Sequence, residues 1–130
     1  FAVLVDCHSM PSSVRSAPGR MRADFVLGDR YGASCAPEIA DVAATILSGL
    51  GYTVSRNKPY AGGHITEHYG RPAEGVHALQ IEINRALYMN ERSLQPNAGF
   101  AQVVADLAIF ARELSEMPDG GLWPMPLAAE

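Results

Sequence analysis

Apolar residues along this chain fall either in short continuous runs or at helical spacing, with polar loops between them. The run at 1–6 and the sequence DFVLG at 24–28 each indicate a buried strand. YTVS at 52–55 and the apolar segment at 76–83 predict two further strands. The chain is therefore expected to contain a sheet of at least these segments.

Two segments have the spacing of amphipathic helices. The first is 36–50, in which Pro37 suits the first turn and Gly51 can close the last. The second is a final helix capped by Asn97. Its expected apolar face consists of Phe100, Val103, Val104, Leu107, Ala111 and Leu114.

Strands and helices alternate, which predicts an α/β fold with a mixed, mostly parallel sheet flanked by helices. Sites in such sheets lie beyond the carboxyl ends of strands, so His8 and the loop after Ile83 are expected at the functional edge. Two long loops, 7–23 and 56–75, interrupt the pattern, and loops of this length inside a compact domain are often functional. The tail from Met117 is expected to lie on the surface, held by Trp123.

Composition and charge exclude several classes of protein. A chain of 130 residues with 48% hydrophobic and 18% charged residues suits one globular domain. The net charge is -4 and no basic block is present, so a nucleic-acid partner is disfavoured. No apolar run has the length of a membrane span, and no signal peptide is present. Cys7 and Cys35 lack a CxxC spacing and fit free thiols in a reducing cytoplasm.

Arginine accounts for every basic residue except Lys58. The planar guanidinium grips carboxylates through two hydrogen bonds, so the bias would suit an acidic small-molecule substrate. A GC-rich genome would produce the same bias, and we favour that explanation.

Glu82 is the first candidate for chemistry. Alternation along 76–83 places it on the face opposite Leu79, Ile81 and Ile83, between two isoleucines in sequence. A carboxylate there is costly to bury unless it is paired or hydrogen-bonded. It therefore faces a polar cavity, a partner or solvent, and the structural alternative is a salt bridge to a nearby arginine such as Arg85.

His8 is the second candidate. Asp6 and His8 share one side of the first strand and emerge together at its carboxyl end. A zinc-bound histidine needs an acceptor for its other ring nitrogen, and a neighbouring acid can supply it. The alternative is a histidine that only hydrogen-bonds a loop carbonyl.

The loop NKPYAGGHITEHYGRP at 57–72 holds a Gly62-Gly63 pair that lets the backbone approach a ligand. His64 and His68 have the spacing of a helical metal pair, but the flanking glycines argue against a helix. The alternative for this loop is a glycine-rich turn with surface aromatic residues.

Four ordered stretches, LVDCHSMPS, DFVLGDRYGASC, NKPYAGGHITEHYGRP and ALQIEINRALYM, resemble the N-formylglutamate amidohydrolase family. The resemblance implies the fold and mechanism of the zinc carboxypeptidase and aspartoacylase group. It also implies hydrolysis of N-formyl-L-glutamate to formate and glutamate, a cytoplasmic step of bacterial histidine degradation. It covers about the carboxyl-terminal half of a typical member. We therefore expect 1–130 to be a single domain forming part of a larger amidohydrolase domain, with an amino-terminal segment missing.

The resemblance also implies roles for individual residues. His8 is expected to bind zinc, and Glu82 to act as the general base. Arg85 is expected to hold a substrate carboxylate or to polarise the formyl oxygen. A further set is expected to bind the substrate: Asn57, Tyr60, Gly63, His64 and Arg30. Catalytic zinc normally has about three protein ligands, so the others are expected upstream of Phe1.

Two alternatives to this function stay open. One is a non-catalytic ligand-binding domain that keeps the pocket and lacks the metal. The other is an amidohydrolase for a different N-acyl amino acid, because one methylene in a pocket is worth only about 1–3 kcal/mol.

Overall fold

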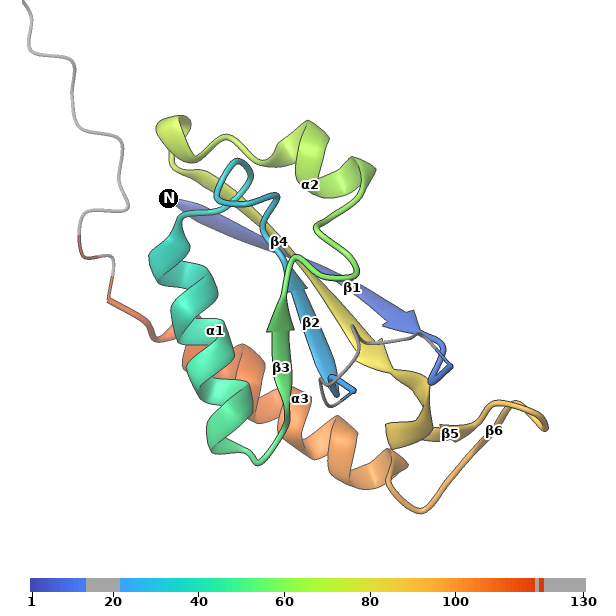
Figure 1. Ribbon diagram of the computed structural model, residues 1–130. Coiled ribbons are helices and arrows are strands. Elements are labelled where there is room, and N and C mark those ends of the chain that lie inside the picture. Colours follow the sequence, from blue (N-terminus) through green and yellow to red (C-terminus); the bar gives the residue numbers. More distant parts are fainter. Residues whose placement is uncertain (14–21, 119, 121–130) are drawn as a thin grey trace, which may run out of the picture.

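The computed structural model describes residues 1–13, 22–118 and 120, and its strands cross the middle of the molecule (Figure 1). The elements are β1 Ala2–Met10, β2 Phe25–Gly28, α1 Pro37–Gly49, β3 Val54–Arg56, α2 His64–Tyr69, β4 Val76–Asn84, β5 Met89–Asn90, β6 Gln95–Pro96 and α3 Phe100–Ser115. Single 3₁₀ turns cover Pro72–Glu74 and Arg85–Leu87. The predicted position of Trp123 lies outside the described residues, as does 14–21 of the first long loop.

The main sheet has the strand order β1-β4-β2-β3. β1 is parallel to β4 and β2 is parallel to β3, whereas β2 runs antiparallel to β4. This confirms the predicted mixed α/β class. β2 and β3 therefore run toward the start of β4, and Gly28 at the end of β2 lies opposite Gln80, in the middle of β4.

The hydrophobic core lies on the sheet face that α1 and α3 cover. β4 contributes Leu79, Ile81 and Ile83, as its alternation predicts, and β2 adds Phe25 and Leu27. The helices contribute their buried stripes, which include Ile39, Ala43, Leu47, Phe110 and Leu114. The amphipathic spacing therefore located this face correctly.

The other face of the sheet carries α2 and the turn before it. Gly28 of β2 allows this close approach, because a Cβ there would lie 2.6 Å from the backbone nitrogen of Gly62. The Thr66 side chain is fully buried under α2 and donates a hydrogen bond to the carbonyl of Gly63 at 2.8 Å. This second face is the one that bears Gln80 and Glu82.

Three local expectations differ from the structure. The first strand continues to Met10, so Cys7 and His8 lie inside β1 and not in a loop. β1 extends this far because it pairs with β4 along its whole length, from Ala2 opposite Val76 to Met10 opposite Asn84.

The second difference is α2, since His64–Tyr69 forms a helix that the flanking glycines seemed to exclude. The glycines lie outside the helix: Gly63 is the extended N-cap and Gly70 follows the last turn. They serve close approach instead, because a Cβ on Gly70 would lie 2.5 Å from the Ser34 side chain.

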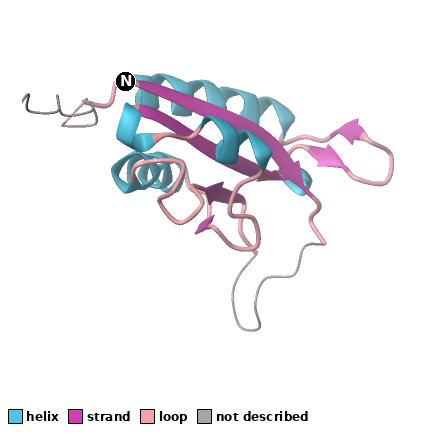
Figure 2. Ribbon diagram, turned by 90° about the horizontal axis from the view of Figure 1, so that it is seen from above, coloured by secondary structure: helices cyan, strands magenta, loops and turns pink. Residues whose placement is uncertain are grey.

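The third difference concerns Asn97, which was expected to cap the final helix. The N-cap is Gly99, and the Asn97 side chain accepts a hydrogen bond from the Gly99 nitrogen at 2.9 Å. Asn97 thus shapes the turn leading into α3. The small hairpin β5-β6 before this turn had no sequence signal and projects from the body of the molecule (Figure 2).

Among the described helices, none is both long and apolar enough to cross a membrane.

Candidate active site

His8 and Glu82 lie directly opposite each other in the parallel pairing of β1 with β4. His8 Nε2 lies 3.0 Å from Asp6 Oδ2, so a carboxylate and not a loop carbonyl holds the ring. The His8 side chain is 50% exposed, whereas Asp6 is 17% exposed. One ring nitrogen is therefore oriented by an acid while the rest of the ring stays accessible, which is the arrangement of a metal-binding histidine.

Glu82 is buried, with 8% of its surface exposed. Gln80, two residues earlier on the same face of β4, donates a hydrogen bond from Nε2 to Glu82 Oε1 at 3.0 Å. Burial raises the pKa of the Glu82 carboxyl, and the charges of His8 and Arg85 offset only part of this shift. A buried carboxylate with a raised pKa suits proton transfer near neutral pH.

Arg85 lies at the same edge but binds a different partner from the one considered above. Its Nε donates to Ser9 Oγ at 3.1 Å and its terminal nitrogen to the Ser9 carbonyl at 3.4 Å. Within the described residues Arg85 makes no salt bridge with Glu82, and no other arginine does. The purely structural explanation of Glu82 as an ion-pair partner is therefore not supported there. The guanidinium is instead fixed beside the residue that follows His8.

The Gly62-Gly63 turn approaches the polar face from the other side. A Cβ on Gly63 would lie 3.3 Å from Gln80 Oε1, so the turn and the Gln80 amide are neighbours. His64 begins α2 and is exposed, with its ring stacked on that of His68 at a centroid distance of 5.4 Å. Gln80 thus links this turn to Glu82.

Tyr60 and Arg30 border the same turn. Tyr60 is half-buried, three residues before Gly63. Arg30 donates to Glu67 Oε1 of α2 at 3.3 Å, and its backbone nitrogen donates to the Ala61 carbonyl at 2.8 Å. Arg30 therefore lies against the turn, with one terminal nitrogen already paired.

Asn57 has a different environment from the other predicted substrate-binding residues. It is 9% exposed and its side chain is held by Asp29, with Asn57 Nδ2 donating to Asp29 Oδ1 at 2.6 Å and Asn57 Oδ1 accepting from the Asp29 nitrogen at 3.1 Å. Asp29 also pairs with Arg56 at 2.5 Å. Asn57 thus joins the residues that follow β2 and β3, and β3 is the edge strand on the other side of the sheet from β1.

Asp29 is nearly fully buried, at 1% exposure. Burial raises the pKa of its carboxyl, but hydrogen bonds from Asn57 and Arg56 outweigh burial and hold the pKa below its ordinary value. It is therefore a buried anion that orders the start of the segment containing Arg30.

The structure thus brings His8, Glu82 and Gly63 to one polar face, with Arg85 beside His8 and with Tyr60, His64 and Arg30 in or next to the glycine turn. Gln80 is the residue that sequence reasoning missed as part of this face. Its signal was present, because it lies two residues from Glu82 in an alternating strand.

The donor set fits one zinc ligand and not a complete site. Within the described residues, no three His, Cys, Asp or Glu side chains converge closely enough to hold a metal ion. His8 is the side chain of this face that could serve as a ligand, and Asp6 contacts its ring at 3.0 Å.

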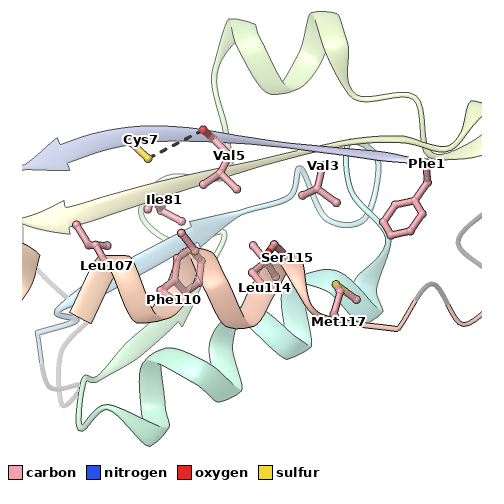
Figure 3. A pocket seen from close by; sticks show the side chains of 11 residues that line it. Phe1, Val3, Val5, Cys7, Ile81, Leu107, Phe110, Leu114, Ser115 and Met117 are labelled. Carbon is pink, nitrogen blue, oxygen red and sulfur yellow. Dashed lines mark hydrogen bonds between the residues drawn. The ribbon is translucent and has the colours of Figure 1, made fainter. Parts of the chain in front are cut away.

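Two hollows lie on the other side of β1 from this polar face. One, of about 450 Å³, lies between β1 and α3, and one of about 310 Å³ includes His8 in its lining. The larger hollow is lined mainly by apolar side chains and not by Glu82 (Figure 3), so the polar side chains of the other face define the candidate active site.

Comparison with known proteins adds to this geometry. A family model described as "N-formylglutamate amidohydrolase" matches residues 1–89. The chain is 38% identical over 117 residues to N-formylglutamate deformylase from Pseudomonas aeruginosa, covering 89% of this chain and 43% of that relative. It is 39% identical over 92 residues to N-formylglutamate deformylase from Pseudomonas putida, covering 70% of this chain and 34% of that relative.

Solved structures give the same picture. The fold is similar to the crystal structure of N-formylglutamate amidohydrolase from Ralstonia eutropha, with a TM-score of 0.78 and 42% identity over 85% of this chain and 41% of that one. A gene product from Agrobacterium tumefaciens is 23% identical with a TM-score of 0.51, and it supports the fold alone. The chain spans less than half the length of each of these proteins.

Proposed function

Because the chain belongs to the N-formylglutamate amidohydrolase family, we propose that it supplies part of the active site of an enzyme that hydrolyses N-formyl-L-glutamate to formate and L-glutamate. Two relatives that are N-formylglutamate deformylases support this substrate. The observation that carries the proposal is the register pair His8 and Glu82 on one polar face.

We propose His8 as a zinc ligand, with Asp6 as the acid that orients it. The remaining ligands would come from protein outside the described residues, since catalytic zinc has about three protein ligands. Zinc, when bound, supplies Lewis acidity that makes a water molecule easier to deprotonate and polarises the formyl oxygen.

Glu82 is the residue that would move the proton. Its carboxylate would accept a proton as the water oxygen attacks the formyl carbon, and would return that proton to the amine nitrogen as the C–N bond breaks. The products are then formate and glutamate, with no further reactant required. The hydrogen bond from Gln80 Nε2 supports this role, because it fixes the carboxylate in one orientation.

Arginine side chains would bind the dicarboxylate substrate. Arg85 is fixed by Ser9 beside His8, so it would hold a carboxylate or polarise the formyl oxygen. Arg30 would offer a second guanidinium at the border of the pocket. The turn with Tyr60, Gly63 and His64 would close the pocket. Asn57 would act indirectly, because its hydrogen bonds with Asp29 order the segment that contains Arg30.

We place this activity in the cytoplasm of a bacterium, in histidine degradation. Support comes from the bacterial relatives and from two free thiols, Cys7 and Cys35, which suit a reducing compartment.

The decisive test measures formate release by the complete protein, with Glu82→Gln compared with Glu74→Gln. Glu82→Gln should lower turnover by roughly three orders of magnitude or more if the proton has no other acceptor, with the fold retained. Glu74 is exposed and distant from the polar face, so its variant should behave as the wild type. A chelator should also stop turnover. Near-normal turnover in Glu82→Gln would remove the general-base assignment.

A second candidate function is a non-catalytic binding domain. The observation that favours it is that, among the described residues, no three His, Cys, Asp or Glu side chains lie close enough together to hold a metal ion. Calorimetric titration of the chain with glutamate and with formate in EDTA separates the two, because saturable binding without metal would support a binding domain. The third possibility is an amidohydrolase for another N-acyl amino acid. Such an enzyme would release the carboxylic acid of that acyl group faster than it releases formate from N-formyl-L-glutamate.

A further inference from the structure

The sequence HITEH at 64–68 has the pattern H-x-x-E-H, in which two histidines four positions apart bind a metal ion from one face of a helix. The flanking glycines argued against a helix in this segment. The structure nevertheless forms α2 from His64 to Tyr69, with Gly63 and Gly70 outside it. The structural condition for a metal-binding pair is therefore met.

Both imidazoles lie on the exposed side of α2. Residues four positions apart are neighbours on a helix surface, and the rings of His64 and His68 stack with their centroids 5.4 Å apart and 20° between their planes. Both residues are exposed, whereas Thr66 between them is fully buried. Among the residues that the structure describes, no hydrogen bond or ion pair involves either ring, so the ring nitrogens are available to a ligand.

The spacing of the two rings suits a single shared ion. Imidazole nitrogen binds zinc at about 2.0–2.1 Å, which places the centres of two rings on one ion about 5 Å apart. The lone pairs lie in the ring planes, so two nearly parallel rings do not yet point at one spot. Exposed side chains change rotamer within nanoseconds, so a turn of the rings is enough to bring the nitrogens together.

The charges around the pair allow a cation to approach. Glu67 follows His64 by three positions and therefore lies on the same side of α2. Its carboxylate pairs with Arg30 at 3.3 Å, which balances the charge of that guanidinium. The pair is separate from the candidate active site, because within the described residues no three His, Cys, Asp or Glu side chains, His8 included, come close enough together to hold a metal ion.

Imidazole ligands select the class of ion. They suit Zn²⁺, Ni²⁺ and Cu²⁺, whereas Mg²⁺ and Ca²⁺ prefer oxygen ligands. We propose that His64 and His68 form a surface site for one such transition-metal ion, distinct from the candidate active site, with water in the remaining coordination positions. Because His64 directly follows Gly63, the bound ion would also restrain the glycine turn beside Gln80.

The test is a calorimetric titration of Ni²⁺ into the complete protein after treatment with a chelator. His68→Gln removes one ligand. The double variant His68→Gln/Tyr69→His restores the number of histidines but places the second imidazole about 100° further round the helix. Tyr69 is 50% exposed, so the double variant changes surface residues only. Circular dichroism checks that both variants fold.

We expect the wild type to have a Ni²⁺ site whose affinity falls at least about tenfold in both variants, because the second ligand of a linked pair acts at a high effective concentration. His8→Gln should keep this site, and Mg²⁺ should not compete for it.

A second readout identifies the ligands directly. Cu²⁺ is paramagnetic, so in protein that carries isotope-labelled histidine it should broaden the NMR signals of both rings, those of His64 and His68, to the same extent. In His68→Gln the same amount of Cu²⁺ should broaden the His64 signal much less.

Three outcomes would overturn the proposal: equal Ni²⁺ affinity of the wild type and His68→Gln, wild-type affinity of the double variant, or broadening of only one of the two rings. Loss of the Ni²⁺ site in His8→Gln would also overturn it, because the measured ion would then be the one proposed for catalysis. Neither readout depends on formate release, so these outcomes are distinguishable from a failure of the proposed function.

Discussion

His8 of β1 faces Glu82 of β4 across a parallel strand pair, and each is held by a polar neighbour two residues earlier in its own strand. Asp6 holds the imidazole and Gln80 holds the carboxylate. The same two-residue spacing on both strands thus produces two oriented side chains on one face.

Replacement of Asp6 by asparagine should lower zinc affinity of the complete protein by about 10–100-fold, because the ring loses its carboxylate partner. Competition with a chromophoric chelator measures this change. Asp41→Asn, on the exposed side of α1, is the control and should leave affinity unchanged. Equal affinities for all three proteins would show that Asp6 does not orient a ligand.

Glu82→Gln should stabilise the metal-free protein at neutral pH. Burial raises the pKa of Glu82, so the folded state binds its proton more tightly than the unfolded state does. Ionisation of Glu82 therefore disfavours folding at pH values above the ordinary glutamate pKa of about 4.3. Urea unfolding at pH 7 and at pH 4 should show a gain in unfolding free energy at pH 7 that disappears at pH 4.

The exposed residue Glu74 supplies the comparison for that experiment. Glu74→Gln should change stability little at either pH. A Glu82→Gln variant that is less stable than wild type at pH 7 would contradict the inferred cost of burying this carboxylate.

Asp29→Asn should destabilise the fold by about 2–3 kcal/mol, since it leaves Arg56 and Asn57 without their buried anion. The pKa of Asp29 is lowered in the folded state, so its contribution is present above the ordinary aspartate pKa of about 3.9 and is lost as pH falls through the folded value. The variant should therefore lose stability less steeply in acid than the wild type. Unfolding midpoints between neutral and acidic pH measure both effects.

Asp41 is the matched residue here as well, because it pairs with the other terminal nitrogen of Arg56 but is 68% exposed. Asp41→Asn should cost at most about 1 kcal/mol, as exposed ion pairs usually do. Similar losses in the two variants would mean that burial does not distinguish these carboxylates.

Gly28→Ala should destabilise the protein by roughly 1–3 kcal/mol and weaken substrate binding, because its methyl group would overlap the backbone of Ala61 and Gly62. Gly49→Ala, at the end of α1, meets no atom within 4 Å and should be neutral or stabilising by up to about 1 kcal/mol. Thermal unfolding and the substrate KM of the complete protein measure the two consequences. Equal effects at the two glycines would contradict the inference that Gly28 is needed for the turn at Ala61 and Gly62 to pack against β2.

Much of the fold could be predicted from residue periodicity. The alternation of β4 placed Glu82 opposite Ile81 and Ile83, and the stripe of α1 identified its buried side. These features depend on the spacing of apolar residues within one segment, so a short stretch of sequence is enough to predict them.

Features that depend on pairing between distant segments were not predictable in this way. The strand order β1-β4-β2-β3 separates Asn57, which follows β3, from His8 of β1. A salt bridge between Glu82 and Arg85 was the structural alternative, and among the described residues Arg85 binds Ser9 of the parallel neighbour β1 instead. The helix at 64–69 was missed because its glycines were treated as interruptions, whereas they bound it on both sides.

The pairing of β1 with β4 also limits which insertions and deletions these two strands can accept. A slip of one residue would turn the imidazole toward hydrocarbon and bring valines to the wet side, because side chains alternate with a period of two. We therefore expect the protein to keep its fold when two residues are inserted or deleted before His8 in β1 or before Glu82 in β4. A change of one residue there should disrupt the fold. One strand register therefore determines both which side chains enter the hydrophobic core and which polar side chains face each other on the other side of the sheet.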